Sequence, residues 1–346
     1  MKTRITELLG IKYPIIQSAM GWIANPELVS AVCNAGALGL LVPGGLTPEE
    51  LCQQIHQIKS NTGNKLFGIN ITPYRPGFKH HIDVIMKEKV LVWSSGLRDP
   101  FAMSNITKPE NVIYIPTVGN VNQAVKMEKA GADAVIVQGW EGGGHTGRIA
   151  STVLIPEVVR AVNIPVIAAG GFCDGKGLAA ALALGADGIA MGTRFAITQE
   201  SPLPPQLKSE YLKASDIDAV LSNSWDGLPM RVIRGENMKR YRGWWTRFWQ
   251  IIPALLTVKK IYKASWSDMV TTANIVRQVN ASLPQFLIGM EMYRRAFLTG
   301  DIKKAYSPAG QVVGRIEDLP TCHEVIQRTV TEAKEIISKL YSQYLA

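Results

Sequence analysis

Short apolar runs rich in β-branched residues recur through the N-terminal part of the chain and alternate with segments of helical spacing. The runs that predict buried strands lie at 15–19, 38–42, 66–70, 90–94, 112–117, 134–138, 166–169 and 188–191. The segments between them that predict helices are 26–35, 48–59, 121–130, 152–162 and 176–184. Repeated alternation of strand and helix indicates a parallel sheet.

Eight strands of nearly continuous apolar character favour a closed (β/α)8 TIM barrel. A doubly wound open sheet is the alternative, but no G-x-G-x-x-G fingerprint follows the first predicted strand. The alternation stops after Phe195, and a last helix is predicted over 320–344. We therefore expect a barrel over 1–200, a helical insertion that caps the substrate site over 201–306, and a segment over 307–346 whose helix returns to the barrel.

The composition narrows the class of protein. The chain has 346 residues, of which 47% are apolar and 19% charged, so we do not expect a disordered protein. The net charge of +9 suits an anionic ligand, a membrane surface or nucleic acid, but no basic run has the spacing of a nucleic-acid motif. Four cysteines without C-x-x-C spacing and a polar N-terminus predict a cytoplasmic protein without a disulfide framework.

The segment 138–147 is the most informative in the chain. It follows the predicted strand 134–138 and places His145 in a glycine-rich loop. Glycines let a backbone approach a flat or phosphorylated ligand closely and adopt positive φ. A histidine is the side chain most easily tuned to exchange a proton near neutral pH. The segment therefore predicts a cofactor cradle with an acid/base group above it.

Other unusual residues follow the remaining predicted strands, and in a barrel these strand ends meet on the working face. Residues 18–21 follow the first strand, 168–171 the seventh and 191–194 the eighth. The small residues after the last two strands are typical of a barrel phosphate site. Asn70 and Gln138 end two other strands, and their amides suit the edge of a flat heterocycle. Each feature alone also fits an ordinary turn, but together they favour a phosphate-bearing flat cofactor.

We do not expect a metal site. Cys52 and His56 lie one turn apart on a predicted helix, but the sequence shows no third ligand beside this isolated pair.

The motifs as a set resemble the nitronate monooxygenase (2-nitropropane dioxygenase) family and its relatives, the FMN-dependent enoyl-ACP reductases. The matching segments are 3–9, 13–20, 67–70, 131–139, 142–145, 165–171, 185–195 and 309–314. They cover residues 1–200 densely and 285–345 loosely, whereas 225–280 match no family motif. Two departures are visible: Ser18-Ala19 replaces Ala-Pro, and Gly142 replaces a common alanine. Both exchange one small residue for another, so they leave the implied cofactor site intact.

The resemblance implies an FMN-binding barrel in which His145 is the catalytic histidine. The backbone at Ala19, Met20 and Gly21, with Asn70 and Gln138, would meet the flavin ring. Gly143, Gly171, Gly192 and Thr193 would hold the ring or the phosphate. The adjoining residues Gly144, Ala169, Gly170 and Met191 complete the expected site.

Two activities follow from the resemblance. A nitronate monooxygenase would use His145 to deprotonate a nitroalkane and O2 to give a carbonyl compound and nitrite. An enoyl-ACP or enoyl-CoA reductase would instead pass hydride from NAD(P)H through FMN to an enoyl thioester. Gln138 favours the monooxygenase, because such reductases tend to carry an acidic residue there. A non-catalytic flavin-binding protein is the alternative of a different class, and the intact glycine-rich loop argues against it.

The segment 241–263 concentrates large aromatics, Trp244, Trp245, Phe248 and Trp249, among Arg and Lys residues. It is too short to span a bilayer, and Pro253 is expected to interrupt any helix there. Three interpretations are open: an ordinary packed part of the cap, a lid over a pocket for long-chain substrates, and peripheral contact with a membrane surface. We predict a contribution to the substrate pocket, with membrane contact as the alternative. A homodimer is also left open.

Overall fold

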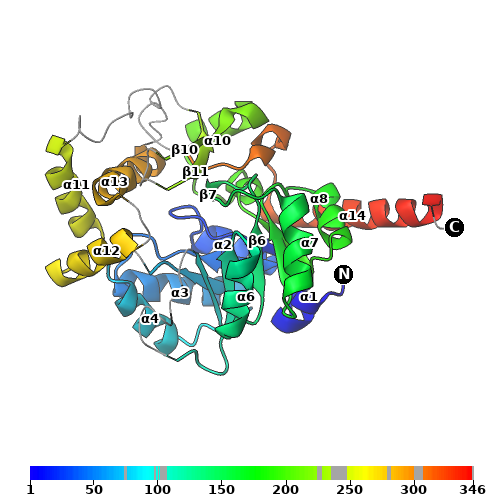
Figure 1. The fold of residues 1–346 in the computed structure, drawn as a ribbon, viewed down its shortest axis with the longest axis horizontal. Helices are drawn as coiled ribbons and strands as arrows, with labels where there is room; N and C mark the ends of the chain where they lie inside the picture. The colour runs from blue at the N-terminus through cyan, green and yellow to red at the C-terminus, as the bar shows by residue number, and fades with distance from the viewer. Residues whose placement is uncertain are drawn as a thin grey trace.

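The computed structural model describes residues 1–73, 76–96, 99, 101, 107–223, 228–234, 248–278, 282–299 and 307–344. Within these residues a closed barrel of parallel strands forms the centre (Figure 1). Its strands in barrel order are β1 (Ile15–Gln17), β2 (Leu38–Leu41), β3 (Gly68–Ile71), β4 (Val92–Gly96), β5 (Ile113–Val118), β6 (Val135–Gln138), β8 (Val166–Ala169) and β9 (Gly188–Met191). Each lies on a predicted strand, so the barrel is confirmed. The open-sheet alternative is wrong because β9 pairs with β1, with Ala190 opposite Ile16.

Helices cover the outside of the barrel. They are α1 (Arg4–Leu9), α2 (Pro26–Asn34), α3 (Pro48–Thr62), α4 (Phe78–Lys87), α6 (Val121–Lys129), α7 (Ser151–Ala161), α8 (Gly175–Ala183) and α9 (Thr193–Ala196). The starts of α2 and α3 were predictable, since Pro26 and Pro48 follow the capping side chains of Asn25 and Thr47. Helix α4 was not predicted. It begins at Phe78, and its N-cap residue is Gly77, which has no side chain to cap the helix.

The barrel interior is a packed core. Ile16, Leu40, Val92, Ile115 and Ile167 fill it from five strands, and all are almost completely buried. A separate apolar layer joins the outward faces of the strands to the helices. Since the barrel itself is filled, a ligand site has to lie at the strand ends.

The insertion contains strands as well as helices, which the sequence did not predict. Its elements are α10 (Pro205–Lys213), β10 (Ala219–Ser222), β11 (Met230–Ile233), α11 (Phe248–Ile261), α12 (Trp266–Gln278) and α13 (Leu283–Thr299). Strand β11 pairs with both β10 and β7 (Gly144–His145) in an antiparallel sheet. The two insertion strands are short, and the partner that completes their sheet is the distant glycine-rich loop, so local periodicity gave no signal.

The expectation that Pro253 interrupts a helix was wrong, because Pro253 lies inside α11. A proline there removes one backbone donor and leaves the carbonyl one turn earlier, that of Trp249, without its helical partner. Both residues are exposed, so water can reach that carbonyl. Within the described residues, no helix combines the length and apolar character needed to cross a bilayer.

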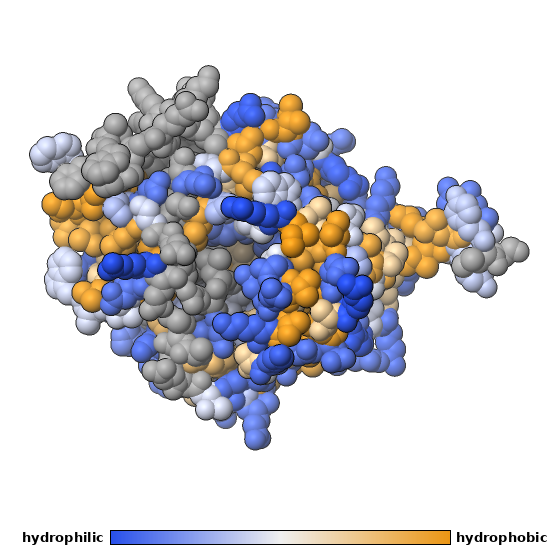
Figure 2. All heavy atoms as spheres, viewed as in Figure 1, coloured by the Kyte–Doolittle hydropathy of each residue, from blue (hydrophilic) through white to orange (hydrophobic). Residues whose placement is uncertain are grey.

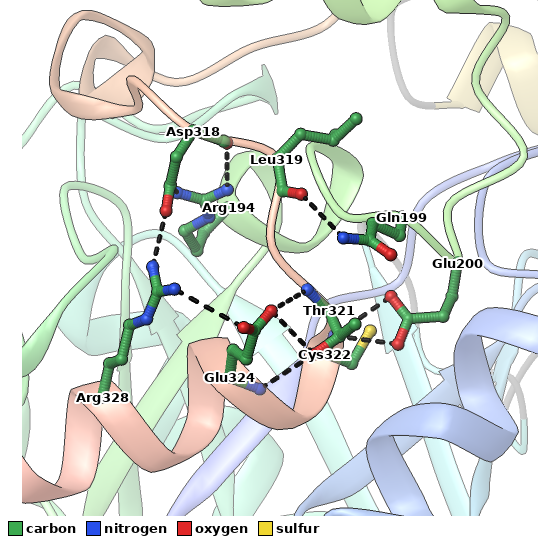
Figure 3. Close-up of polar contacts among 9 residues, drawn as sticks. All are labelled: Arg194, Gln199, Glu200, Asp318, Leu319, Thr321, Cys322, Glu324 and Arg328. Carbon is green, nitrogen blue, oxygen red and sulfur yellow. Dashed lines mark hydrogen bonds and ion pairs between the residues drawn. The ribbon is translucent and has the colours of Figure 1, made fainter.

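The C-terminal segment returns to the barrel through α14 (Cys322–Tyr344), which packs on α8. At this contact a Cβ on Gly175 would lie 2.5 Å from Cβ of Glu332. Figure 3 shows how the start of α14 is held: the guanidinium groups of Arg194 and Arg328 approach the two carboxylate oxygens of Asp318 at 2.9 and 2.6 Å. The far end of α14 extends beyond the body of the molecule (Figure 1).

Candidate active site at the carboxyl ends of the strands

A cavity of about 670 Å³ opens at the carboxyl ends of the barrel strands. It brings together nearly all the predicted site residues, namely Ala19, Met20, Gly21, Asn70, Gln138, Gly143, Gly144, His145, Ala169, Gly170, Gly192 and Thr193. Two predicted residues, Met191 and Gly171, are not among the residues that line it. Met191 is fully buried in the core, and its carbonyl accepts a hydrogen bond from the Ser18 amide. Gly171 has a φ of +90° and lies beside the Glu141 side chain.

The glycine-rich loop is shaped by Gln138. The Nε2 atom of Gln138 donates to the carbonyls of Gly143 and His145, at 3.2 and 2.9 Å. On the other side of the loop, a Cβ on Gly143 would lie 2.6 Å from the backbone carbon of Ala309. The loop is therefore held between the end of β6 and the C-terminal segment. Gln138 therefore holds the loop in place through these hydrogen bonds, and it also lines the cavity.

His145 is fixed through its backbone as well as by the loop. It belongs to β7 and pairs with Met230 of β11, which also lines the cavity. Its side chain lines the cavity and is partly buried. A strand pairing on one side and the Gln138 hydrogen bond on the other restrict where the imidazole can lie, as an acid/base residue requires.

Arg231 braces the same loop and was missed by the sequence analysis. It lies opposite Gly144 across the β7–β11 pair and is only 3% exposed. Its Nη2 donates to the Trp140 carbonyl at 2.9 Å and its Nη1 to the Ala219 carbonyl at 2.8 Å. Burial lowers the pKa of Arg231, and the charge of Glu141 opposes that shift. No local motif could have indicated a contact between residues so far apart in the chain.

Backbone donors after β8 and β9 remain available for an anion. In the part of the chain that the structure describes, no residue accepts a hydrogen bond from the backbone N–H of Gly171 or Gly192. A Cβ on Gly192 would meet nothing closer than the Ser18 Cβ at 3.7 Å. The Thr193 hydroxyl, in contrast, is already used: it accepts a 2.9 Å hydrogen bond from the Gly310 amide. Thr193 therefore joins the C-terminal segment to the site.

The cavity continues past the predicted residues to the outer helix α6. Gln123, Lys126, Met127 and Ala130 lie on one face of that helix or at its end, and all four line the cavity. Pro308, Gly310 and Val312 line it from the C-terminal segment. Among the described residues of α11, α12 and α13, none lines it. Trp244 and Trp245 lie outside the described residues.

Cys52 and His56 are not an isolated pair as expected, because Glu88 joins them. The Glu88 carboxylate lies 2.9 Å from His56 Nε2 and 3.4 Å from Cys52 Sγ. Lys59 Nζ also contacts that carboxylate at 2.9 Å. The Lys59 ammonium therefore already compensates the charge of Glu88. The cluster is an ion-pair network that joins α3 to the end of α4.

The fold and cavity define a (β/α)8-barrel protein with a ligand site at the carboxyl ends of its strands. The family model described as nitronate monooxygenase matches residues 2–76 and 71–332. The chain belongs to this oxidoreductase family.

Similar proteins carry different activities. A 5-hydroxy-7a-methyl-1-oxo-octahydro-1H-indene-4-carboxyl-CoA dehydrogenase from Rhodococcus jostii is 38% identical, and the match covers 98% of both chains. A probable nitronate monooxygenase from Staphylococcus aureus is 33% identical over 70% of this chain and 82% of its own. Among solved structures, FabK from Thermotoga maritima has a TM-score of 0.82 at 33% identity, covering 99% of each chain.

Proposed function

We propose that this protein is a flavin-dependent oxidoreductase that binds FMN in the cavity. The backbone at Ala19–Gly21 with Asn70 would meet the ring, and the N–H group of Gly192, which lines the cavity, would hold the phosphate. The residues fit such a group, because a Cβ on Gly144, which lines the cavity, would meet nothing within 4 Å and so leaves room for a flat ring. The backbone donor described after β9 suits one phosphate, which supports a mononucleotide over a dinucleotide. Bound flavin supplies a two-electron acceptor for hydride.

The substrate we propose is an acyl thioester. The observation that carries this proposal is the extension of the cavity to α6, where Gln123 and Lys126 line it beyond the glycine-rich loop. An extended thioester with phosphate groups needs such a channel and a cation near its outer end, whereas a small nitroalkane does not. The Rhodococcus relative, whose name specifies a carboxyl-CoA substrate, matches the chain through the insertion as well as the barrel.

His145 is the proposed acid/base residue. In oxidation of a saturated acyl thioester, the imidazole accepts the proton from the carbon beside the thioester carbonyl. A flavin held by the backbone at Ala19–Gly21 and Gly192 would supply the hydride acceptor for the neighbouring carbon, and loss of the proton and hydride would leave a carbon–carbon double bond between the two carbons. In the reverse direction the same imidazole returns the proton. Gln138 and Arg231 keep the loop, and hence the imidazole, in place during either reaction.

Anaerobic mixing of purified protein with candidate substrates tests the proposal. A saturated acyl-CoA should bleach the flavin absorbance, or NADH or NADPH should bleach it and an enoyl-CoA restore it. Release of FMN on denaturation should accompany either result. Bleaching by an alkyl nitronate with no response to any thioester would overturn the substrate assignment.

Nitronate monooxygenase activity is the second candidate. The family model, the Staphylococcus relatives and the amide at position 138 support it. In that reaction His145 removes the proton from a neutral nitroalkane, and O2 is consumed. Oxygen uptake with nitrite release from an alkyl nitronate distinguishes this activity from thioester oxidation.

A reducing, cytoplasmic compartment suits this proposal. Cys33, Cys52, Cys173 and Cys322 are all free thiols, and three of them are buried. Burial raises the pKa of Cys33 and of Cys173 to about 11, so neither is a reactive thiolate.

A further inference from the structure

Helix α11 is apolar on both its buried and its exposed sides. Ala254, Val258 and Tyr262 pack into the core of the insertion and barrel. On the opposite side, Trp249 is 88% exposed, Ile252 68% and Leu256 52%. These three positions follow helical spacing and so form one stripe along the helix. More than half of each of these three side chains is therefore accessible to solvent.

Helix α12 carries two further exposed apolar residues. Trp266 is 57% exposed and Val270 61%, and they lie one turn apart. Lys259 Nζ of α11 lies 5.1 Å from the centre of the Trp266 ring, so the two helices meet at this edge. We call Trp249, Ile252, Leu256, Trp266 and Val270 the α11–α12 apolar face. Figure 2 shows apolar residues gathered at the left of the view, where Figure 1 places α11.

The charge on this segment is positive. Residues 248–278 hold Lys259, Lys260, Lys263 and Arg277 against one acidic residue, Asp268, which gives +4 − 1 = +3. Lys263 lies 3.6 Å from the Glu50 carboxylate, so we count only Lys259, Lys260 and Arg277 as cations for a membrane surface. Lys260 is exposed on the same side of α11 as Leu256, one turn further along. Exposed tryptophans bordered by lysines are the composition of helices that lie at the interface of an anionic bilayer.

We infer that the α11–α12 apolar face docks on the surface of a membrane that contains anionic lipids. The apolar side chains enter the boundary between headgroups and acyl chains, and the lysines lie among the anionic headgroups. The alternative role as a wall of the substrate pocket has no support in the described residues, because none from α11 to α13 lines the cavity. The inference does not depend on the proposed reaction.

Sedimentation of the full-length protein with lipid vesicles tests the inference. Vesicles containing phosphatidylglycerol should bind it, vesicles of phosphatidylcholine alone should bind it weakly, and added salt should release it. The double variant Trp249→Ala/Trp266→Ala should lower partitioning onto anionic vesicles by about tenfold. Lys260→Glu should lower it several-fold with the apolar face intact, so the result does not rest on one variant.

Matched controls separate this face from general stickiness. Ile217 is 75% exposed but stands between Asp216 and Asp218, so Ile217→Ala should leave vesicle binding unchanged. Lys176 is exposed on α8, and Lys176→Glu should have a smaller effect than Lys260→Glu. Circular dichroism should confirm that each variant is folded.

Two outcomes would overturn the inference. Wild-type protein that fails to bind anionic vesicles is one, and a tryptophan double variant that binds like the wild type is the other. If the wild-type protein does not bind vesicles but forms a dimer, and the double variant is a monomer, then a second copy of the chain occupies the face instead.

Discussion

Gly142 and Gln138 are matched to each other at the start of the glycine-rich loop. A Cβ on Gly142 would lie 2.5 Å from Nε2 of Gln138. That same Nε2 holds the carbonyls of Gly143 and His145. A glycine at position 142 therefore lets the Gln138 amide lie across the loop.

Gly142→Ala should consequently displace the Gln138 side chain and loosen the His145 loop. We expect a loss of about 1–3 kcal/mol in the free energy of unfolding, because a Cβ is forced into a packed contact. Urea unfolding measures it. In a Gln138→Ala background the same substitution should cost much less, since the clashing amide is gone. Gly96→Ala, whose Cβ would meet nothing within 4 Å, is the control. Equal costs in both backgrounds would show that the two residues are not coupled.

His145→Ala should leave flavin content unchanged and lower kcat for the acyl thioester by about 10²–10⁴, the usual contribution of a positioned acid/base. Single-turnover reduction of the flavin measures the proton-removal step directly. If nitroalkanes prove to be substrates, the variant should lose less of its turnover of a preformed nitronate than of a neutral nitroalkane. A nitronate has no proton for His145 to remove. If the substrate reduced the flavin of the variant at the wild-type rate, His145 would not be the acid/base residue.

Arg231→Met should separate positioning from binding. The variant keeps much of the buried volume but leaves the carbonyls of Trp140 and Ala219 without their donors. We expect a loss of about 1–3 kcal/mol in stability and a fall in kcat larger than any change in KM, since the loop carrying His145 loses its brace. Arg231→Lys should recover part of the kcat. An unchanged kcat in a destabilised Met variant would mean that Arg231 serves stability alone.

The sequence predicted the barrel well because each strand is a buried apolar run and because two helices, α2 and α3, begin at a proline after a capping side chain. It also predicted most of the cavity, since Asn70, Gln138 and the small residues fall at strand ends, which a barrel brings together. It could not predict Arg231 or the β7–β11 pairing, because these depend on contacts between distant segments. Pro253 misled the prediction because a proline on an exposed helix face costs less than one in a packed interior.

Asp318 makes the anchoring of α14 sensitive to acid. Burial raises the pKa of Asp318, but hydrogen bonds from Arg328 and Arg194 outweigh it, so the pKa is held below its usual value. A carboxyl group whose pKa is lower in the folded than in the unfolded protein stabilises the fold. This stabilisation is fully present at pH values above the unfolded pKa of about 3.9, and it is lost as the pH falls through the folded pKa.

Asp318→Asn should therefore lower the free energy of unfolding at neutral pH. We expect about 1 kcal/mol, because the carboxylate is 49% exposed and partly screened. The difference between variant and wild type should shrink as the pH is lowered into the acid range, which urea unfolding at a series of pH values measures. A difference that stays constant with pH would contradict the ionic origin.

Lys126 tests the channel that supports the thioester proposal. It lines the cavity from α6. Under the thioester proposal its ammonium would meet the phosphates of a coenzyme A thioester. Lys126→Ala should raise KM for an acyl-CoA by about three- to tenfold, the usual value of an exposed charge contact, with little change in kcat. The same acyl group on a short thioester without phosphates should show no difference between variant and wild type. Lys129, exposed on the same helix outside the cavity lining, provides the control through Lys129→Ala. An equal increase in KM for both thioesters would show that Lys126 does not bind the phosphates. An equal increase in KM for both lysine variants would show the same.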